Sequence, residues 1–535
     1  MGLNYDTQWW KHMQVYEIYI RSFKDSNGDG IGDLKGIISK LDHFSDIHVD
    51  CIWITPFYPS PQDDMGYDIS EYTTIDSLFG TMEDFSELIR ETKKRGIKVI
   101  IDFVMNHSSD EHLWFKKSVE GIEPFDKYYV WQNATGFTTE GLPIPPNNWL
   151  SVFDGIAWKW SDRRNQFYLH QFSEKQPDFD LRNEKVRNEF KDILKTWLDR
   201  GVSGIRIDAC AFFVEDDQFR DEHLIYPNSK NQDKNNWSNW KHNYTISLPE
   251  TFTVVQELRE YMDTYSKEKG DYERVILIEA IGPIKKTVLF YGTDDNPIPQ
   301  VPLFFEYVET RNNELYSAKF LHESVISWMT SMPKNAVPNW LMENHDARRI
   351  ASRYVKEFTS IFNIFTMMLP GIVCIYYGQE ICMMDGPIRA DQTQDHQIAT
   401  DTGISRDSCR TPMQWDDTIN AGFTTKSKPW LPVNPNYSYS NLESQKKDNN
   451  SCYSIFKELT ELRKTVTCVH GDLQSYVLSP TVYAITRSLK GAATYVVVLN
   501  LGTEPELINL DAEIPNLPQF LNVLVASEIA GYKKG

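Results

Sequence analysis

Short apolar runs alternate with amphipathic segments along most of the chain, and this alternation constrains the fold more than any other feature. Helical patterns cover residues 82–95 and 184–200, between runs that have the composition of buried strands. Strands that alternate with helices form parallel βα units, so the pattern predicts an α/β fold, a (β/α)8 TIM barrel. The strand-like runs are VYEIYI from Val15, CIWIT from Cys51, KVIIDFV from Lys98, GIRID from Gly204, VILIEA from Val275 and IVCIYY from Ile372.

The alternation stops in two places, and these breaks predict the domain organisation. Residues 106–177 are polar and rich in tryptophan, and a connection of that length is expected to fold as a subdomain over the active face. From about residue 471 short strands follow one another without helices, which is typical of an all-β domain. We predict a catalytic barrel formed by 1–105 and 178–465, an inserted subdomain after strand 3 formed by 106–177, and a C-terminal β-sandwich-like domain formed by 466–535.

The charge of the chain limits its partners. Lys and Arg together number 55 against 75 Asp and Glu, which gives a net charge of -20. Such a chain is repelled by phosphate backbones and anionic lipid, so we expect no nucleic-acid partner and a neutral substrate. The sequence has no uninterrupted apolar run of 18 residues, and its first residues, MGLNYDTQWW, lack the apolar centre of a signal peptide. We therefore expect no membrane contact from the chain as given, and a signal peptide absent from it.

Cysteines and glycosylation motifs indicate the compartment. The seven cysteines follow no zinc-binding spacing, and their odd number leaves at least one unpaired. Motifs of the Asn-x-Ser/Thr type permit a secreted glycoprotein, although each motif alone is a weak signal. These motifs begin at Asn133, Asn236, Asn243, Asn436 and Asn449.

Three acidic residues follow apolar stretches: Asp208 after GIRI, Glu279 after VILI, and Asp346 in ENHD. The carboxyl ends of barrel strands are where such folds carry their active sites. Retaining glycosidases pair a carboxylate nucleophile with a second carboxyl group that donates a proton. Arg206 lies two residues before Asp208, on the same face of the strand, and a guanidinium there favours an ionised nucleophile. The apolar run before Glu279 predicts an environment that favours the protonated form. From spacing alone, ordinary structural ion pairs explain these residues equally well.

Taken together, the motifs carry a family resemblance. The segments DFVMNH, GIRIDA, ILIEA and ENHD resemble, in this order, the four signature regions of the α-amylase superfamily of glycoside hydrolases (family 13), and QPDFDLRN resembles its auxiliary fifth region. The segments GDGIGDLKGI, TPFYPSP, MGYDISEY, LPGIVCIYYGQEI and SRDSCRTPMQW are similar to the α-glucosidase branch, especially insect maltases and sucrases. The resemblance covers essentially the whole chain.

The resemblance implies roles for the site residues. Asp208 would be the nucleophile, Glu279 the acid/base, and Asp346 the third carboxylate, which binds sugar hydroxyls. The blind pocket of the branch implies an exo-acting enzyme that takes a single terminal glucose. For His107 and His345 the alternative is a packing or capping role, and for Tyr67 it is a position on the rim of the barrel. The implied substrate-binding residues are Tyr67, Asp68, His107, Arg206, His345 and Arg410.

A glycine-containing acidic loop predicts a structural cation. Asp25, Asn27, Asp29 and Asp33 place oxygen atoms at alternate positions, which suits a hard ion such as Ca²⁺. An EF-hand is excluded because its twelfth position would be a glycine rather than glutamate. The resemblance adds the carbonyl of Ile31 as a ligand, allows Ca²⁺ or Mg²⁺, and implies no organic cofactor. The alternative is a turn of this composition that holds no ion.

The activity implied is hydrolysis of terminal α-glucose from sucrose, maltose and short α-1,4-glucosides through a covalent glucosyl-enzyme. Ala209 follows the nucleophile, and a small residue there resembles enzymes that prefer α-1,4 linkages or sucrose over α-1,6 linkages. The alternatives are a transglucosidase or sucrose isomerase and, from another class, a catalytically idle surface receptor or transporter heavy chain. A heavy chain would lack the three carboxylates. We expect a secreted monomer or homodimer, in a gut lumen or at a cell surface.

Overall fold

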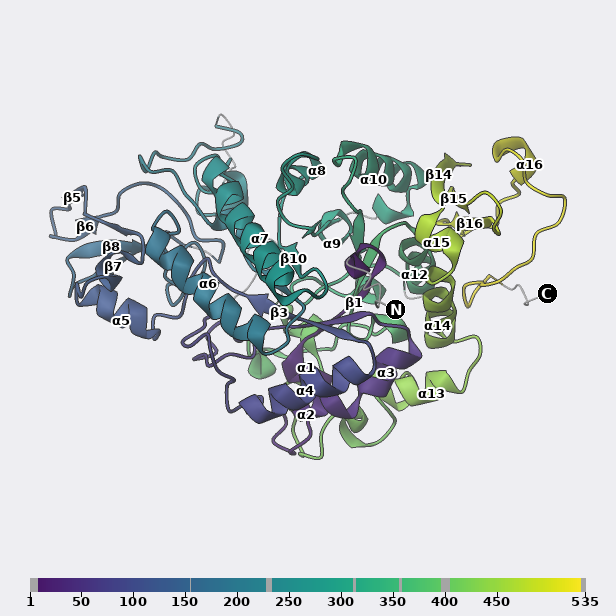
Figure 1. Ribbon diagram of the computed structural model, residues 1–535, viewed down its shortest axis with the longest axis horizontal. Helices are drawn as coiled ribbons and strands as arrows, with labels where there is room; N and C mark the ends of the chain where they lie inside the picture. The colour runs from purple at the N-terminus through teal and green to yellow at the C-terminus, as the bar shows by residue number, and fades with distance from the viewer. Residues whose placement is uncertain are drawn as a thin grey trace.

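The computed structural model describes residues 8–153, 155–227, 233–310, 314–355, 358–395 and 405–530. Its centre is an eight-stranded parallel sheet in the order β11-β10-β9-β3-β2-β1-β13-β12, which confirms the predicted α/β barrel fold (Figure 1). The strands are β1 (Gln14–Ile18), β2 (Cys51–Ile54), β3 (Lys98–Phe103), β9 (Gly204–Ile207), β10 (Val275–Ile278), β11 (Val301–Pro302), β12 (Asn339–Leu341) and β13 (Ile372–Tyr376).

The six strands predicted from apolar runs are all present, whereas β11 and β12 were missed because they have only two and three residues. A single side chain joins these two strands. Asn339 accepts a hydrogen bond from the Phe304 N–H (2.9 Å) and donates one to the Pro302 carbonyl (2.6 Å). Asn339 is fully buried, so its amide supplies the connection that two such short strands do not make through their backbones.

The barrel is surrounded by amphipathic helices, two of which were predicted within one residue of their bounds. In α4 a capping box between Thr81 and Asp84 fixes the start, and Phe85 and Leu88 face inward. The α-helices are α1 (Ile20–Phe23), α2 (Leu34–Ser39), α3 (Leu41–Asp46), α4 (Met82–Lys94), α5 (Leu113–Val119), α6 (Glu184–Asp199), α7 (Pro249–Lys269), α8 (Ile284–Thr287), α9 (Glu306–Glu309), α10 (Ala318–Ser331), α11 (Ile350–Arg353), α12 (Thr359–Met368), α13 (Leu442–Lys446), α14 (Cys452–Arg463), α15 (Val466–His470) and α16 (Leu510–Glu513).

Side-chain alternation along the strands divides the apolar core into two. On β2, Ile52 and Ile54 join the large cluster that includes helix residues, whereas Cys51 and Trp53 join a smaller inner cluster. The inner cluster fills the interior of the barrel, as expected for a barrel of this size. Its strand residues include Val15, Cys51, Trp53, Ile100, Val275, Leu277, Val301, Leu341, Ile372 and Cys374.

The segment after β3 forms small antiparallel sheets of its own. One has the order β4-β8-β7, and β5 pairs with β6; these strands lie with α5 at one side of the molecule (Figure 1). Trp149 and Trp158 pack into a separate apolar cluster here, so these tryptophans build a core and do not form an exposed platform for sugars. The strands are β4 (Trp131–Gln132), β5 (Gly136–Phe137), β6 (Pro143–Ile144), β7 (Trp158–Ser161) and β8 (Gln166–Leu169).

The C-terminal segment contains an antiparallel sheet of β14 (Asp472–Val477), β15 (Val482–Ser488) and β16 (Tyr495–Asn500). It lies at the opposite side of the molecule from β5 and β6, beside α10 and α12 (Figure 1). This antiparallel sheet confirms the predicted C-terminal β domain. The exact domain boundaries stay predictions.

One disulfide joins distant parts of the barrel. Cys382, after β13, bonds to Cys452 at the start of α14. Five cysteines remain free and buried: Cys51, Cys210, Cys374, Cys409 and Cys468. In the part of the chain that the structure describes, no helix is long and apolar enough to span a bilayer.

Candidate active site

Charged residues continue the inward-facing positions of three strands, and two of them, Arg206 and Glu279, are predicted site residues. Asp102 follows Ile100 by two residues on β3, Arg206 follows Gly204 on β9, and Glu279 follows Leu277 at the end of β10. Apolar side chains therefore fill the lower barrel, and the next inward position on β3, β9 and β10 is charged. The barrel thus collects polar groups at its carboxyl end.

Arg206 lies at the centre of this group and is fully buried. Its Nη1 is 2.6 Å from Asp208 Oδ1 and 3.0 Å from Asp102 Oδ1, and its Nη2 is 3.1 Å from Glu279 Oε2. Three carboxylates therefore share one guanidinium, and the two predicted catalytic groups contact the same side chain. A buried cation with several carboxylate partners holds each of them in a fixed place.

The surroundings of Glu279 differ from the apolar environment that the sequence predicted. Besides Arg206, its Oε2 accepts a hydrogen bond from the Ala209 N–H at 2.9 Å. Ala209 has a left-handed backbone with φ of 49°, which turns this N–H toward Glu279. Burial raises the pKa of Asp208 and Arg206 opposes that effect, while the neighbouring charges of Glu279 and Asp102 add to it.

Asp346 lies in a different electrostatic environment. Its Oδ1 is 2.9 Å from Arg410 Nη2 and 3.1 Å from Arg406 Nη1, and its Oδ2 is 3.2 Å from His345 Nε2. Burial disfavours ionisation, but the charges of His345, Arg406 and Arg410 together lower the pKa of Asp346 well below its ordinary value. Asp346 is therefore a permanently charged group at neutral pH.

Asp68, one of the implied substrate-binding residues, is fully buried. The Asp68 carboxylate accepts hydrogen bonds from the backbone N–H groups of Asp63 and Asp64 and from the Ser60 hydroxyl, so it organises its own loop. Burial raises its pKa to about 6. Asp64, in the same loop, contacts Arg406, with its Oδ1 2.7 Å from Arg406 Nη2.

Tyr67 and His107 are close to the carboxylates. Tyr67 stacks on His345 with ring centroids 5.3 Å apart, and its hydroxyl contacts Asp102. His107 is buried, with Gln176 Nε2 at 3.0 Å from its Nε2, and burial lowers its pKa to about 3. His107 is thus a neutral ring whose Nε2 accepts from an amide of the inserted segment.

Several polar residues of the site were not predicted. Asp102 and Glu17 each interrupt an apolar strand at an inward position, and this interruption could have predicted them as site residues. Arg406 and Gln176 lie in irregular segments, where no periodic pattern marks them. The residues that sequence reasoning missed are Glu17, Asp64, Asp102, Gln176 and Arg406.

Carboxylates of the acidic loop accept hydrogen bonds from backbone N–H groups of the same segment. Asp25 accepts hydrogen bonds from the backbone of Asn27, Gly28 and Gly30, and Asp33 caps α2 through Gly36. Among the described residues, no group of three His, Cys, Asp or Glu side chains has the arrangement of a metal site. A cation held by Asp25, Asn27, Asp29, Ile31 and Asp33 stays a prediction.

Chelation tests this prediction. If the loop holds Ca²⁺, EDTA should lower the melting temperature by about 2–5 °C, because an ion bound only by the folded state stabilises it. Re-addition of Ca²⁺ in excess should restore the value, and Asp29→Asn should remove the response. An identical melt with and without EDTA would show that the loop works without an ion.

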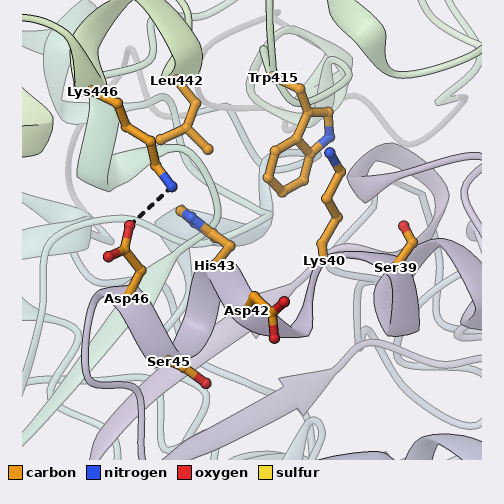
Figure 2. Close-up of a pocket in the computed structure, with 9 residues that line it drawn as sticks. All are labelled: Ser39, Lys40, Asp42, His43, Ser45, Asp46, Trp415, Leu442 and Lys446. Atoms are coloured by element: carbon orange, nitrogen blue, oxygen red, sulfur yellow. Dashed lines mark ion pairs between the residues drawn. The ribbon is translucent and has the colours of Figure 1, made fainter.

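One pocket of the structure is lined by residues other than the predicted site residues. Figure 2 shows it between α2, α3 and the segment around α13, with Lys446 of α13 paired to Asp46 of α3 at 2.9 Å. None of its lining residues belongs to the predicted site. We therefore place the chemistry at the carboxyl end of the barrel.

An α/β barrel that gathers three carboxylates and a buried arginine at the carboxyl ends of its strands has the architecture of a glycoside hydrolase. Comparison with known proteins defines the family. Residues 17–471 match the α-amylase family, in its catalytic domain, and the chain belongs to this family of glycoside hydrolases.

Its relatives include α-glucosidases and maltases of insects. The chain is 41% identical to maltase 1 of Drosophila virilis over 98% of its own length and 83% of that protein. It is 39% identical to an α-glucosidase of Apis mellifera, over 95% of its length and 88% of that protein. The solved structure of the α-glucosyl transfer enzyme XgtA matches with a TM-score of 0.83 and 34% identity, over 92% of this chain and 91% of that one.

Proposed function

We propose that the protein is a retaining, exo-acting α-glucosidase that releases terminal non-reducing α-glucose from sucrose, maltose and short α-1,4-glucosides. The observation that supports it best is the contact of Asp208 and Glu279 with the same Arg206 guanidinium. This contact keeps the two carboxyl groups close, and retaining enzymes need a separation of about 5–5.5 Å.

In this proposal Asp208 attacks the anomeric carbon while Glu279 donates a proton to the leaving oxygen. The bond between glucose and its leaving group breaks as a β-glucosyl ester forms on Asp208. Glu279, now ionised, accepts a proton from water as the water attacks the same carbon, and α-glucose leaves. The ionised Asp346 stabilises the positive charge that develops on the sugar in both steps.

The loop around Asp64 supports cleavage from the chain end. Asp64 and Asp346 both contact Arg406, and Asp346 also contacts Arg410. Paired charges of this kind can bind the hydroxyls of one terminal glucose and block further units. Arg406 and Asp64 are therefore proposed to share the binding role first given to Asp68.

Glucosyl transfer is the second candidate for the same site. It is favoured by the similarity to the transfer enzyme XgtA and to a structure of trehalulose synthase MutB, which matches with a TM-score of 0.80 and 33% identity over 93% of this chain and 92% of that one. The two activities share the first step and differ in whether water or a sugar accepts the glucosyl group.

A non-catalytic role is the third candidate. The human amino acid transporter heavy chain SLC3A1 is 36% identical over 98% of this chain and 75% of that protein. The contacts among Asp208, Glu279 and Arg206 favour an enzyme, since a heavy chain has no need for them.

Secretion is supported by three observations. Relatives include salivary α-glucosidases of Anopheles gambiae and Aedes aegypti. The disulfide suits an oxidising compartment. Three of the glycosylation motifs begin at exposed asparagines, namely Asn133, Asn243 and Asn449. We propose a secreted glycoprotein that is a monomer or homodimer.

Product analysis on sucrose and maltose tests the activity. At equal concentrations we expect glucose from both sugars, with fructose equal to glucose on sucrose, because water accepts the glucosyl group. Proton NMR in the first minutes should show α-glucose before mutarotation. Fructose in excess of glucose would identify transfer, and early β-glucose would contradict retention. No release from either sugar by folded protein would favour the non-catalytic role.

A further inference from the structure

Glu17 is a carboxylate in the middle of an apolar strand, and its burial requires an explanation. It lies on β1 in the run VYEIYI and is 1% exposed. Its Oε1 is 2.6 Å from Nδ1 of His345, which is equally buried. A carboxylate in such a place is costly unless it is paired or protonated.

The other side of the His345 ring defines where the protons lie. Nε2 is 2.7 Å from the Tyr67 hydroxyl and 3.2 Å from Asp346 Oδ2. The Tyr67 O–H donates to Asp102 Oδ2 at 3.1 Å, and burial raises the pKa of Tyr67 well above its ordinary value, so its single proton is already used. Asp346 is ionised and can only accept. His345 Nε2 must therefore carry a proton, which it directs at the Tyr67 hydroxyl and at Asp346 Oδ2.

The short contact at Nδ1 also needs a proton. If both Glu17 and Nδ1 were deprotonated, two lone pairs would face each other at 2.6 Å. The Glu17–His345 pair therefore holds two protons, one at Nε2 and one shared between Nδ1 and Oε1. The pair is neutral overall, whichever of the two atoms carries the shared proton.

We propose that Glu17 is a positioning residue that retains the second proton of this pair and so keeps the His345 Nε2–H directed at Tyr67 and Asp346. The proposal deepens the proposed function, since Asp346 is the carboxylate assigned to transition-state stabilisation. Without Glu17, a neutral imidazole could place its only proton on Nδ1. Nε2 would then present a lone pair to an ionised carboxylate.

The charges around the pair support this arrangement. Burial raises the pKa of Glu17, and the His345 hydrogen bond and the charge of Arg206 oppose that effect. Arg410 donates from Nε to the His345 carbonyl at 2.7 Å, which fixes the backbone of the ring. The titratable or charged groups that face the pair are Cys374 and Tyr376 on β13, Asp102 on β3, Arg206 on β9, Tyr67 after β2, Tyr19 after β1, Asp346 after β12, and Cys409 and Arg410 in the segment 406–410.

Glu17→Gln tests the proposal because it keeps the size of the side chain and removes its charge. The second proton is bound at low pH and lost as pH rises. Without the Glu17 carboxylate, the pair should lose its second proton at a lower pH. We expect the alkaline limb of the kcat/KM profile to move to lower pH by about one unit, with the acid limb unchanged. At neutral pH we expect kcat/KM to fall about tenfold, mainly through kcat.

The chain offers a matched control in a second buried pair of the same kind. His43 Nε2 is 2.8 Å from Glu380 Oε1, and both side chains are buried; His43 lines the pocket of Figure 2, away from the site. Glu380→Gln should lower the melting temperature without moving either limb. If Glu17→Gln also changes only the melting temperature, Glu17 is merely structural and the proposal is wrong.

A spectroscopic measurement on the unaltered protein separates this proposal from the activity. With ¹⁵N-labelled histidine, His345, assigned through the loss of its signals in His345→Asn, should show a protonated Nε2 at neutral pH and a low-field resonance for the shared proton. A bare Nε2 would overturn the proposal even if the protein hydrolyses sugar. A protonated Nε2 in a protein without hydrolytic activity would leave the proton arrangement intact and reject the proposed function instead.

Discussion

Asp208→Asn should reduce turnover of sucrose and maltose by about 10⁴-fold or more while the protein stays folded. The amide cannot form the glucosyl ester on which the two-step reaction depends. The fold should persist because Arg206 keeps its contacts with Asp102 at 3.0 Å and Glu279 at 3.1 Å, so the buried cation is not left without partners. Initial rates and the melting temperature measure the two effects.

Asp217→Asn is the matched control for this variant. Asp217 lies on the loop that follows the same strand, but it is exposed. It should retain full activity. Activity of Asp208→Asn within tenfold of the unaltered enzyme would remove Asp208 from the nucleophile role.

Glu279→Ala should lose most activity on sucrose and maltose but much less on an aryl α-glucoside with a good leaving group. The natural leaving groups need a proton from Glu279, whereas an activated phenolate does not. Azide should then restore turnover of the aryl substrate, because it attacks the glucosyl-enzyme without a general base. The product should be α-glucosyl azide, since the second displacement inverts the β-linked intermediate.

The configuration of the azide product distinguishes the two carboxylates. In Asp208→Ala the azide would displace the aryl group directly and give β-glucosyl azide. The α product from Glu279→Ala and the β product from Asp208→Ala would assign both roles. The opposite pairing would require the roles of Asp208 and Glu279 to be exchanged.

The sequence predicted most of the barrel because six strands are long enough to be visible as apolar runs. β11 and β12 could not be predicted, since strands of two and three residues show no periodic pattern. Their place depends on neighbouring strands and on the buried amide of Asn339. Such a tertiary contact has no local signature.

Site residues that follow strands or motifs were predicted, whereas others in irregular loops were not. Asp208, Glu279 and Asp346 each follow an apolar strand or a recognisable motif, and in the structure Arg206 contacts the first two whereas Arg410 contacts Asp346. The contact of Asp64 with Arg406 could not be predicted from sequence, because Asp64 and Asp68 both lie in one irregular loop. There the backbone path decides which carboxylate meets Arg406 and which one accepts hydrogen bonds from its own loop.

The Asn339 amide has a consequence for the placement of two carboxylates of the site. The rest of the barrel circumference is fixed by the register of parallel ladders, in which any insertion displaces a whole strand. Between β11 and β12, in the part of the chain that the structure describes, side chains make the connection, among them the Asn339 amide with two hydrogen bonds. Glu279 directly follows the strand that pairs with β11, and Asp346 follows β12. Loss of the Asn339 amide should therefore disturb the placement of both carboxylates.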